Sequence, residues 1–464
     1  MFKTKIFREY DIRGVYNEDY DAAFAETLGR GFAQIIKQQY QEQSLTVAVG
    51  RDARESGITL SSAFSQGLQK EGIQVLDLGV VPTPAVYFAA HQLKTHGAVC
   101  ITGSHNPSEY NGFKSCVGTS TLHGEQIQRL KDICLKIDTV TPTHTEQTKP
   151  IKHYDILKEY SDSIIQRVAL KNRKLKVVVD SGNGAASHVA PGVLERLGCE
   201  VIPLFCELDG SFPNHHPDPT VIENLEDLRK KVIETKADLG IAFDGDADRI
   251  GAVDENGLPV YGDELLVLFA REILSRKPGA TIISEVKSSH RLYNDIRAHG
   301  GNPIMWKTGH SLIKAKMKET NAELAGEMSG HIFFSDRYFG FDDAIYAAAR
   351  LIEILSATDS SFSKLLDLPC TVNTPEIRVD CPDELKFAVV DQVKKKLSPL
   401  YKTVAIDGVR IETATGWGLL RASNTQPVVV MRFEAQTQNE LDLLQNVVET
   451  SFKESLCETT KQSL

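Results

Sequence analysis

The sequence lacks the features that place a protein in a membrane or on nucleic acid. No stretch reaches the roughly 20 consecutive apolar residues that a spanning helix needs. The basic start, MFKTKIFREYDIRG, is not followed by the apolar run of a signal peptide. Positive charge is in deficit, with 52 Lys and Arg against 62 Asp and Glu and a net charge of −10, which disfavours non-specific binding to nucleic acid or anionic lipid. We expect a cytoplasmic protein with no nucleic-acid partner and no membrane partner.

Cysteine is sparse and scattered. The eight cysteines show no Cys-x-x-Cys spacing, so the sequence predicts reduced thiols rather than a disulfide framework or a zinc site. The composition is otherwise that of a folded globular protein, with 41% hydrophobic and 25% charged residues. A chain of 464 residues exceeds what one hydrophobic core supports, because domains average about 150 residues. Several domains are therefore expected.

One pattern occurs three times along the chain: an apolar, β-branched run that is followed at once by polar or glycine residues. The runs are LTVAVGRD from Leu45, LKVVVDSGNG from Leu175 and ATIISEVKSS from Ala280. Each has the length of a buried strand in a parallel sheet. A glycine and a second strand-like run follow each one after about 20 residues, which leaves room for one crossover helix ending at the glycine. These glycines are Gly72, Gly198 and Gly301.

The repeat predicts an α/β fold of three similar domains with mixed, mainly parallel sheets. The chain from about residue 371 breaks the pattern, and we expect it to form a smaller C-terminal α+β domain. The polar stretch at 139–150 is the expected first linker. The predicted domains are 1–148, 149–256, 257–370 and 371–464. Because ligands of open parallel sheets bind at the carboxyl ends of strands, the polar loops of the domains are expected to surround a central cleft.

The strongest chemical signal is the loop DGDADR at 244–249, which follows an apolar run. Three carboxylates at alternate positions after a strand, with a glycine for a tight turn, can converge as oxygen ligands. A site with few protein oxygen donors favours Mg²⁺. The alternatives are a solvated acidic turn or a calcium loop with Glu255 at its twelfth position, although apolar residues occupy that loop's middle. The sequence thus predicts a magnesium site at Asp244, Asp246 and Asp248.

The loop TGSHNP at 102–107 also follows an apolar run. Ser104, placed between a glycine and a histidine at a strand end, has the position of a nucleophile or phosphate carrier. The alternative is a plain turn, since these residue types all favour turns. Lys114 lies close enough downstream to reach the same site.

Two further loops carry side chains suited to binding, one to sugar hydroxyls and the other to a phosphate. Glu327, Ser329 and His331 in GEMSGH offer an acceptor, a hydroxyl and an imidazole for sugar hydroxyls. The loop RASNT at 421–425 offers a guanidinium, hydroxyls, an amide and backbone N–H groups, which together form a phosphate clamp. A structural histidine and a surface turn are the respective alternatives.

Two other motifs carry less weight. Gly182-Asn183-Gly184 after a strand resembles the start of a dinucleotide-binding fingerprint, but Ser187 stands where a third glycine or alanine belongs. His215 and His216 could ligate a metal, although the prolines around them favour a stiff turn.

Taken in order, TGSHNP, DGDADR, GEMSGH and RASNTQP resemble the motifs of the α-D-phosphohexomutase superfamily, and most closely its bacterial phosphomannomutase/phosphoglucomutase group. The resemblance extends to FREYDIRG, NGFK, FPNHHPDP and KTGHSLIK. Met328, and Asn424 with Gln426, depart from the pattern of phosphoglucosamine mutases, which points to hexose rather than amino-sugar substrates. Ala247 stands where family members often carry glycine.

The resemblance implies reversible phosphoryl transfer between the 6- and 1-positions of a hexose phosphate, mannose or glucose, through a phosphoserine and a hexose 1,6-bisphosphate. In that family the phosphate on the serine, here Ser104, shares Mg²⁺ with the three aspartates. Glu327 and Ser329 hold sugar hydroxyls. The non-transferring phosphate is held by Arg421, Ser423, Asn424 and Thr425. The pocket is completed by Tyr10, Arg249, Lys287, His310 and His331. Candidates for proton transfer are Arg13, His105, Lys114 and His331.

Three alternatives to this activity remain: a phosphoglucosamine mutase, a Mg²⁺-dependent phosphosugar phosphatase that loses the phosphoserine to water, and a non-catalytic phosphosugar sensor. In every case the expected partner is a small phosphosugar. We expect a monomer or weak dimer.

Overall fold

The computed structural model describes residues 2–42, 44–137, 149–171, 173–423 and 426–463. Residues 139–148 of the expected linker lie outside the described residues. So do Asn424 and Thr425 of the predicted phosphate clamp.

The first α/β domain contains a sheet with strand order β1-β5-β4-β2-β3-β7. β2 (Thr46–Arg51), the first repeated run, pairs in parallel with β3 (Gln74–Val80) and β4 (Gly97–Ile101). β4 then pairs in antiparallel fashion with β5 (Tyr110–Val117). The other elements are η1 (Thr4–Ile6), β1 (Ile12–Val15), α1 (Ala22–Gln39), α2 (Ser56–Lys70), α3 (Thr83–Gln92), β6 (Ser120–Thr121), α4 (Glu125–Lys136) and β7 (Lys152–His153).

The second domain repeats this arrangement. β8 (Lys176–Asp180) pairs in parallel with β9 (Glu200–Leu204) and β10 (Leu239–Phe243), and β10 pairs antiparallel with β11 (Ile250–Asp254). β10 is buried along its whole length, as expected for a strand covered on both faces. The other elements are α5 (Leu157–Gln166), η2 (Ala185–His188), α6 (Ala190–Arg196), η3 (Ile222–Leu225), α7 (Glu226–Thr235) and β12 (Pro259–Val260), which pairs with β11.

The third domain shows the same topology again. β13 (Thr281–Glu285) pairs in parallel with β14 (Asn302–Trp306) and β15 (Leu324–Gly326), and β15 pairs antiparallel with β16 (Ile332–Phe334). The helices are α8 (Gly262–Arg276), α9 (His290–Ala298), α10 (His310–Thr320), α11 (Ala344–Ser356) and α12 (Phe362–Leu365).

The fourth domain has a different, antiparallel sheet of order β17-β22-β21-β20-β19, with β18 pairing β22. Helices α13 and α14 pack against β21. The elements are β17 (Val372–Asn373), β18 (Ile377–Asp380), α13 (Lys386–Leu397), β19 (Lys402–Val404), β20 (Val409–Glu412), β21 (Gly416–Ala422), β22 (Val428–Ala435) and α14 (Gln438–Ser463). The predicted α/β class, with three similar domains and a smaller α+β domain, is confirmed. The exact boundaries between the domains stay predictions.

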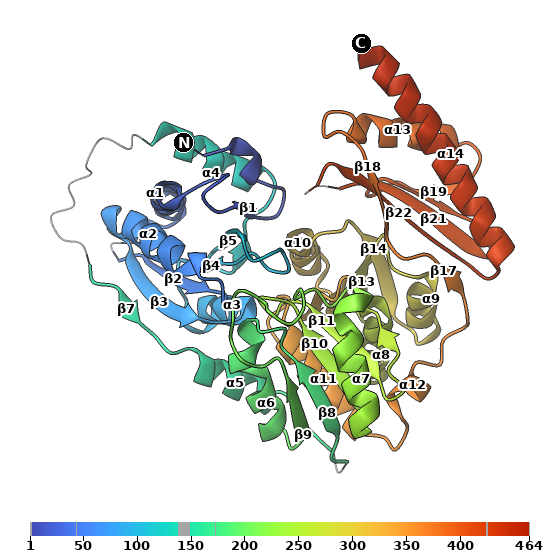
Figure 1. Cartoon of the computed structure of the whole chain (residues 1–464), viewed down its shortest axis with the longest axis horizontal. Coiled ribbons are helices and arrows are strands. Elements are labelled where there is room, and N and C mark those ends of the chain that lie inside the picture. The colour runs from blue at the N-terminus through green and yellow to red at the C-terminus, as the bar shows by residue number, and fades with distance from the viewer. Residues whose placement is uncertain (1, 43, 138–148, 172, 424–425, 464) are drawn as a thin grey trace.

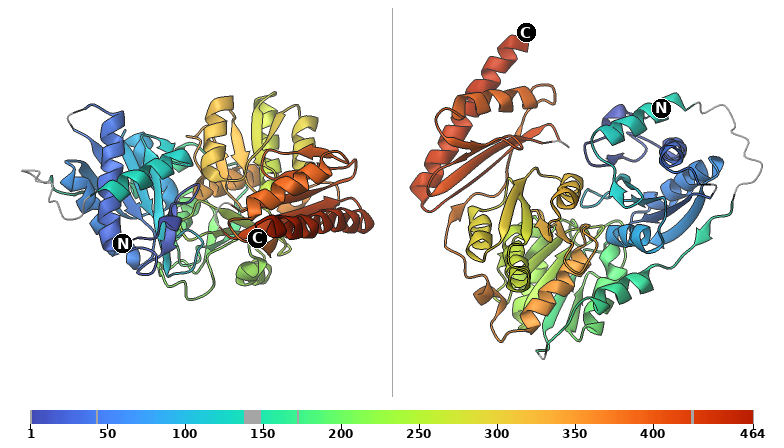
Figure 2. Two further views of the ribbon diagram at one scale, coloured as in Figure 1. Left: turned by 90° about the horizontal axis from the view of Figure 1, so that it is seen from above. Right: turned by 180° about the vertical axis from the view of Figure 1, so that it is seen from behind.

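The four domains follow one another along an arc, from the blue first domain through green and yellow to the red fourth domain (Figure 1). The first and fourth domains lie on either side of α10, and the views from above and behind agree (Figure 2). One continuous cluster of buried apolar side chains runs through the first three domains, whereas the fourth domain has a separate core. Helix α11 links the second and third domains, because it packs against α5, α6 and α8.

Glycines end the first crossover helix of each repeated unit, as the sequence predicts, because a residue there adopts the left-handed conformation. Gly72 and Gly198 have φ values of 78° and 94°. In the third unit the left-handed residue is Gly300, with φ 77°, one position before the expected Gly301. Gly301 serves packing instead, since a Cβ there would lie 2.7 Å from a methyl of Ile296.

The structure also bears on membrane-spanning helices and on the cysteines. Within the described part of the chain, no helix combines the length and apolar character needed to span a bilayer. All eight cysteines are free thiols, and five of them are buried.

A glycine pair allows α1 and α2 to pack at very short distance. A Cβ on Gly29 would lie 2.2 Å from the carbonyl oxygen of Phe64, and one on Gly67 would lie 2.1 Å from that of Glu26. We expect Gly29→Ala to lower the free energy of unfolding by about 1–3 kcal/mol, because the helices must separate. Urea denaturation measures this change. Gly192→Ala in α6, where no atom lies within 4 Å of the new Cβ, is the matched control and should be neutral or slightly stabilising. Equal stability of both variants would contradict the packing argument.

Candidate active site

The loop between β4 and β5 holds Ser104 in a left-handed conformation with φ 50°. This backbone region is uncommon for residues other than glycine and persists only where the surroundings fix it. The Ser104 N–H donates to Thr102 Oγ1 at 2.7 Å, and that hydroxyl donates to Asp52 Oδ2 at 2.8 Å. Ser104 is 1% exposed. The side chain is thus fixed by the strand end rather than lying in a solvated turn.

Arg54 provides a second support for this loop, and the sequence analysis missed it. Its side chain is fully buried and donates to the carbonyl oxygens of Ser104 at 2.8 Å, Asn106 at 2.6 Å and Pro107 at 2.5 Å. Its Nε donates to Asp52 Oδ2 at 3.0 Å. The only available signal was that Asp52 and Arg54 directly follow the first repeated strand. No local motif marks an arginine that binds carbonyls some 50 residues away.

The loop between β10 and β11 brings three buried carboxylates to Ser104. Oxygen atoms of Asp244, Asp246 and Asp248 lie within 4.8 Å of one another, and all three residues are 0% exposed. The Ser104 hydroxyl donates to Asp244 Oδ2 at 2.8 Å. Gly245 allows the two loops to touch, because a Cβ there would lie 2.5 Å from the Ser104 carbonyl oxygen. The structure therefore joins the two strongest sequence signals at one point.

Lys114, on β5, is the cation that faces these carboxylates. Its Nζ donates to Asp246 Oδ2 at 2.8 Å and to Asp248 Oδ2. Burial by itself would lower the pKa of Lys114, but Asp246 and Asp248 more than offset this and raise it above its usual value. Burial, followed by the charges of Asp246 and Asp248, raises the pKa of Asp244 well above its usual range. The charges of Arg249 and Lys114 act in the opposite direction on Asp244 but do not offset this rise.

The donor set fits a magnesium ion. Asp246 Oδ1 and Asp248 Oδ1 are buried and have no hydrogen-bond partner among the described residues. Hard carboxylate oxygens are the ligands that Mg²⁺ prefers, and a buried oxygen without a partner is costly unless a cation or water satisfies it. Asp244, Asp246 and Asp248 are the residues that would hold the ion, beside the Ser104 hydroxyl.

His105 and Arg13 also contact the Ser104 loop. His105 Nδ1 lies 3.2 Å from Ser104 Oγ. Burial, then the positive charges of Arg249, Arg13 and Lys114, holds the pKa of His105 well below its usual value, so this imidazole is neutral. Arg13 Nη1 donates to Asn106 Oδ1 at 2.8 Å.

Two histidines connect this cluster to the third domain. Arg249 Nε donates to His331 Nε2 at 3.0 Å. The ring of His310 stacks on that of His331 with centroids 5.4 Å apart. Tyr10 meets the His310 ring edge-on at 6.2 Å. Burial and the charge of Lys314 lower the pKa of His310. The predicted residues Tyr10, Arg249, His310 and His331 therefore lie in one continuous group.

The third-domain loop is fixed by contacts with its neighbours. Glu327 Oε1 accepts the N–H of Gly309 at 2.6 Å, and the Tyr10 hydroxyl donates to the carbonyl oxygen of Thr308 at 2.8 Å. Ser329 is half-buried in the turn between β15 and β16. Tyr10 comes from the first domain, 298 positions before Thr308, so it ties the first and third domains together at the site.

The fourth domain reaches the same segment through Arg421. Arg421 Nε donates to Asp407 Oδ2 at 3.0 Å, and the same oxygen accepts the N–H of Thr308 at 3.1 Å. Burial alone would lower the pKa of Arg421, but Asp407 and then Tyr10 and Glu285 raise it.

Lys287 and Ser423 complete the described part of the predicted set. Lys287 Nζ lies 3.1 Å from Glu376 Oε2 and 3.5 Å from Glu285 Oε1. Ser423 Oγ accepts the N–H of Gln426 at 3.1 Å. Sequence reasoning missed the two carboxylates that hold Lys287, and Glu285 was marked only by its place at the end of a repeated strand.

The two weaker motifs have structural roles. Gly184 packs against the metal loop, since a Cβ there would lie 2.7 Å from the carbonyl oxygen of Gly245. His215 Nε2 contacts Asp180 Oδ2 at 3.0 Å, which fixes the histidine turn against the end of β8.

Family models for the four domains of phosphoglucomutase/phosphomannomutase match this chain in order. They cover residues 4–141 (alpha/beta/alpha domain I), 158–257 (domain II), 261–371 (domain III) and 376–451 (C-terminal domain). The chain belongs to the phosphoglucomutase/phosphomannomutase family. The resemblance to the α-D-phosphohexomutases stated from the motifs is thereby confirmed.

Individual family members are similar over nearly the full length. The phosphomannomutase/phosphoglucomutase of Pseudomonas putida is 52% identical over 447 residues, 96% of this chain and 95% of that protein. The Pseudomonas aeruginosa phosphomannomutase/phosphoglucomutase is 48% identical over 452 residues, 97% of this chain and 96% of that protein. The crystal structure of a phosphoglucomutase/phosphomannomutase family protein from Burkholderia thailandensis has a TM-score of 0.90 at 42% identity, covering 98% of each chain.

The raised pKa of Asp244 makes a prediction about metal binding. Because its pKa is raised, Asp244 keeps a proton up to a higher pH than an ordinary aspartate does, so we expect Mg²⁺ binding to release protons and affinity to rise with pH. Calorimetric titration of the metal-free protein with Mg²⁺, in buffers of different ionisation enthalpy, measures the protons released. Asp246→Asn should abolish the binding, and Asp209→Asn, on the exposed surface of the same domain, should not change it. Binding of equal affinity below and above neutral pH, with no proton release, would contradict this account.

Proposed function

We propose that this protein is a phosphohexomutase that moves a phosphoryl group reversibly between the 1- and 6-positions of a hexose phosphate, mannose or glucose. One observation carries the proposal: the buried hydroxyl of Ser104 lies 2.8 Å from Asp244 at the centre of the carboxylate cluster. The relatives named phosphomannomutase/phosphoglucomutase at 52% and 48% identity support the same activity.

Phosphoryl transfer begins from a phosphoserine at Ser104. The free hydroxyl of a 1- or 6-phosphosugar attacks phosphorus in line, the bond to Ser104 Oγ breaks, and a hexose 1,6-bisphosphate forms. Such a step needs positioning and neutralisation of charge more than covalent assistance from the protein. Lys114, Arg13 and Arg249 supply fixed positive charge around Ser104. When bound by the three aspartates, Mg²⁺ adds a divalent charge that stabilises the transferring phosphoryl group.

The proton of the attacking hydroxyl must leave as the new bond forms. His105 is neutral and lies beside Ser104, so it is able to accept a proton. His331 is a second candidate base, because its ring lies next to Asp248. Lys114 and Arg13 hold positive charge near the leaving oxygen of Ser104, and Lys114 is the candidate that gives this oxygen the proton that restores the serine hydroxyl.

Net isomerisation requires the bisphosphate to turn around, so that its other phosphate returns to Ser104. One clamp must therefore hold either phosphate. We assign this clamp to Arg421, Ser423, Asn424 and Thr425 of the fourth domain, with Tyr10, Lys287 and His310. Glu327 and Ser329 hold the sugar hydroxyls. The separate core of the fourth domain supports this assignment, because a domain with its own core can move as a unit when the site opens and closes.

The serine carrier is the first test of the proposal. Ser104→Ala should leave the fold intact and lower multiple-turnover conversion by at least about 10³-fold, because no group remains to carry the phosphoryl. A coupled assay with mannose 1-phosphate and glucose 1-phosphate in parallel, each with a trace of the 1,6-bisphosphate, measures it. Ser108→Ala, exposed in the same loop, is the control. Normal turnover of Ser104→Ala, or release of inorganic phosphate as fast as isomer formation in the wild type, would reject the mutase. Higher activity on glucosamine phosphate than on the two hexose phosphates would show that the protein is a phosphoglucosamine mutase.

The phosphate clamp is the second test. Arg421→Ala should raise KM by roughly 10- to 100-fold with a smaller effect on kcat, because a hydrogen bond to a charged group contributes about 1.5–3 kcal/mol. Steady-state kinetics with glucose 1-phosphate gives both constants. Lys395→Ala, on the exposed face of α13, is the control from the same domain. An unchanged KM in this variant would show that Arg421 does not bind the substrate phosphate.

A further inference from the structure

Asp342 is a buried carboxylate that touches both histidines of the site, and no sequence motif marked it. It lies between β16 and α11 and is 0% exposed. Its Oδ2 lies 3.2 Å from His331 Nδ1 and 3.3 Å from His310 Nδ1. One carboxylate oxygen is therefore shared between two imidazoles that stack on each other.

The contacts around His331 allow only one neutral tautomer. Its Nε2 accepts a hydrogen bond from Arg249 Nε, and a guanidinium has donors but no acceptor. On the opposite side, Nδ1 faces two carboxylate oxygens, Asp342 Oδ2 at 3.2 Å and Asp248 Oδ1 at 3.6 Å. A proton on Nε2 would set two donors against each other and leave the Nδ1 lone pair against two negative oxygens. The proton must therefore lie on Nδ1.

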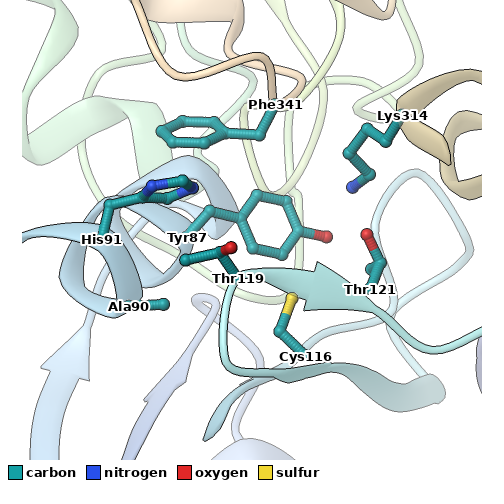
Figure 3. Close-up of a pocket in the computed structure, with 8 residues that line it drawn as sticks. All are labelled: Tyr87, Ala90, His91, Cys116, Thr119, Thr121, Lys314 and Phe341. Carbon is teal, nitrogen blue, oxygen red and sulfur yellow. The ribbon is translucent and has the colours of Figure 1, made fainter. Parts of the chain in front are cut away.

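Lys314 fixes the orientation of the Asp342 carboxylate. Its Nζ donates to Asp342 Oδ1 at 2.8 Å, which leaves Oδ2 for the histidines. Lys314 itself is held over the Tyr87 ring, with Nζ 4.2 Å from the ring centroid. Figure 3 shows Lys314 and Tyr87 facing each other at a small pocket that Phe341, the neighbour of Asp342, also lines.

The contacts from Asp342 to the histidines are close but are not aligned as full hydrogen bonds. Neither Oδ2 nor the two Nδ1 atoms has a well-oriented partner within the described part of the chain. A single oxygen cannot lie in line with both rings at once. In sites without substrate, such bonds are often poorly aligned and tighten when the substrate binds.

The same atoms were considered as a metal site, because Asp248, His331 and Asp342 offer ligand atoms within 4.8 Å of one another. The atoms that face one another are His331 Nδ1, Asp342 Oδ2 and Asp248 Oδ1. Lys314 on Asp342 Oδ1 and Arg249 on His331 Nε2 place two positive charges next to these atoms, and those charges repel a further cation. We therefore describe the cluster as a network of close polar contacts.

We propose that Asp342 is a positioning residue, which holds His331 with its proton on Nδ1 and its Nε2 lone pair toward Arg249, so that Nε2 is the proton acceptor of the site once Arg249 Nε turns from the ring to a substrate phosphate. The same Oδ2 also lies 3.3 Å from His310 Nδ1. This role rests on the proposed mutase function, in which His331 takes part in proton transfer.

Asp342→Asn tests the role sharply because Lys314 dictates how the amide must lie. The amide oxygen must face the Lys314 ammonium, so the NH₂ group must face the histidines. An NH₂ donor requires a lone pair on Nδ1 and thus drives the proton to Nε2, against Arg249. The shape of the side chain is unchanged, so the fold should be kept. In the double variant with Lys314→Met, the amide is free to turn its oxygen toward the histidines.

The readout is the two-bond ¹H–¹⁵N correlation pattern of protein labelled with ¹⁵N-histidine, assigned with His331→Gln and His310→Gln, together with kcat and KM. We expect the wild type to show the Nδ1–H tautomer at His331 and Asp342→Asn to show the Nε2–H tautomer. We also expect Asp342→Asn to lower kcat by roughly 10²-fold with KM nearly unchanged, and the double variant to recover part of kcat. The single variant Lys314→Met is the matched control and should keep the wild-type tautomer.

Several results would overturn the role of Asp342. These are an unchanged tautomer in Asp342→Asn, a loss confined to KM, or a double variant no better than the single one. A shift of the His331 Nδ1 signal on titration with Zn²⁺, in the presence of Mg²⁺, would show a metal site instead. Failure of the mutase function itself is distinguishable, because it would remove wild-type turnover while the tautomer measurement still reports on Asp342.

Discussion

The burial of three carboxylates at the end of one strand is the constraint on which the rest of the structure depends. Asp244, Asp246 and Asp248 are fully buried, and isolated charges in such surroundings are strongly destabilising unless they are paired. Their cation, Lys114, and their hydroxyl partner, Ser104, both come from the first domain. The first two domains therefore have to be fixed relative to each other before the site exists. The continuous core of the first three domains provides that rigidity.

The fourth domain stands apart from this rigid body. Its core is separate, and apolar contact with the third domain is confined to a small cluster of Val286, Trp417 and Leu419 with its neighbours. At the site, Arg421 is linked to Thr308 through Asp407. Further polar contacts join the two domains, such as those of Arg410 with the carbonyl oxygens of Val286 and Ser288. A clamp on a separately folded domain suits a reaction whose intermediate must be kept and yet turned around.

Much of the fold and part of the site could be predicted from the sequence. The three apolar runs became β2, β8 and β13, because buried parallel strands leave a strong local pattern. Ser104 and the aspartates stood out because their loops follow such strands directly. Asp52, Arg54 and Asp342 were missed, since each acts through partners distant in the chain or on another loop and sits in no local motif. In the sequence FDDA, nothing local distinguishes Asp343, which caps helix α11, from Asp342, which contacts the two histidines.

The sequence by itself determined the strands, the three-fold repeat and the chemical character of each loop, because these depend on apolar periodicity and residue type within about ten positions. Only the tertiary structure decided which loops meet. The Ser104 hydroxyl donates to Asp244, which lies 140 positions further along the chain. The Tyr10 hydroxyl donates to the carbonyl oxygen of Thr308, which lies 298 positions further along. Those contacts follow from domain packing, in which a glycine at position 245 allows two backbones to touch. The proton position on His331 was likewise decided in three dimensions, by the donor and acceptors on either side of its ring.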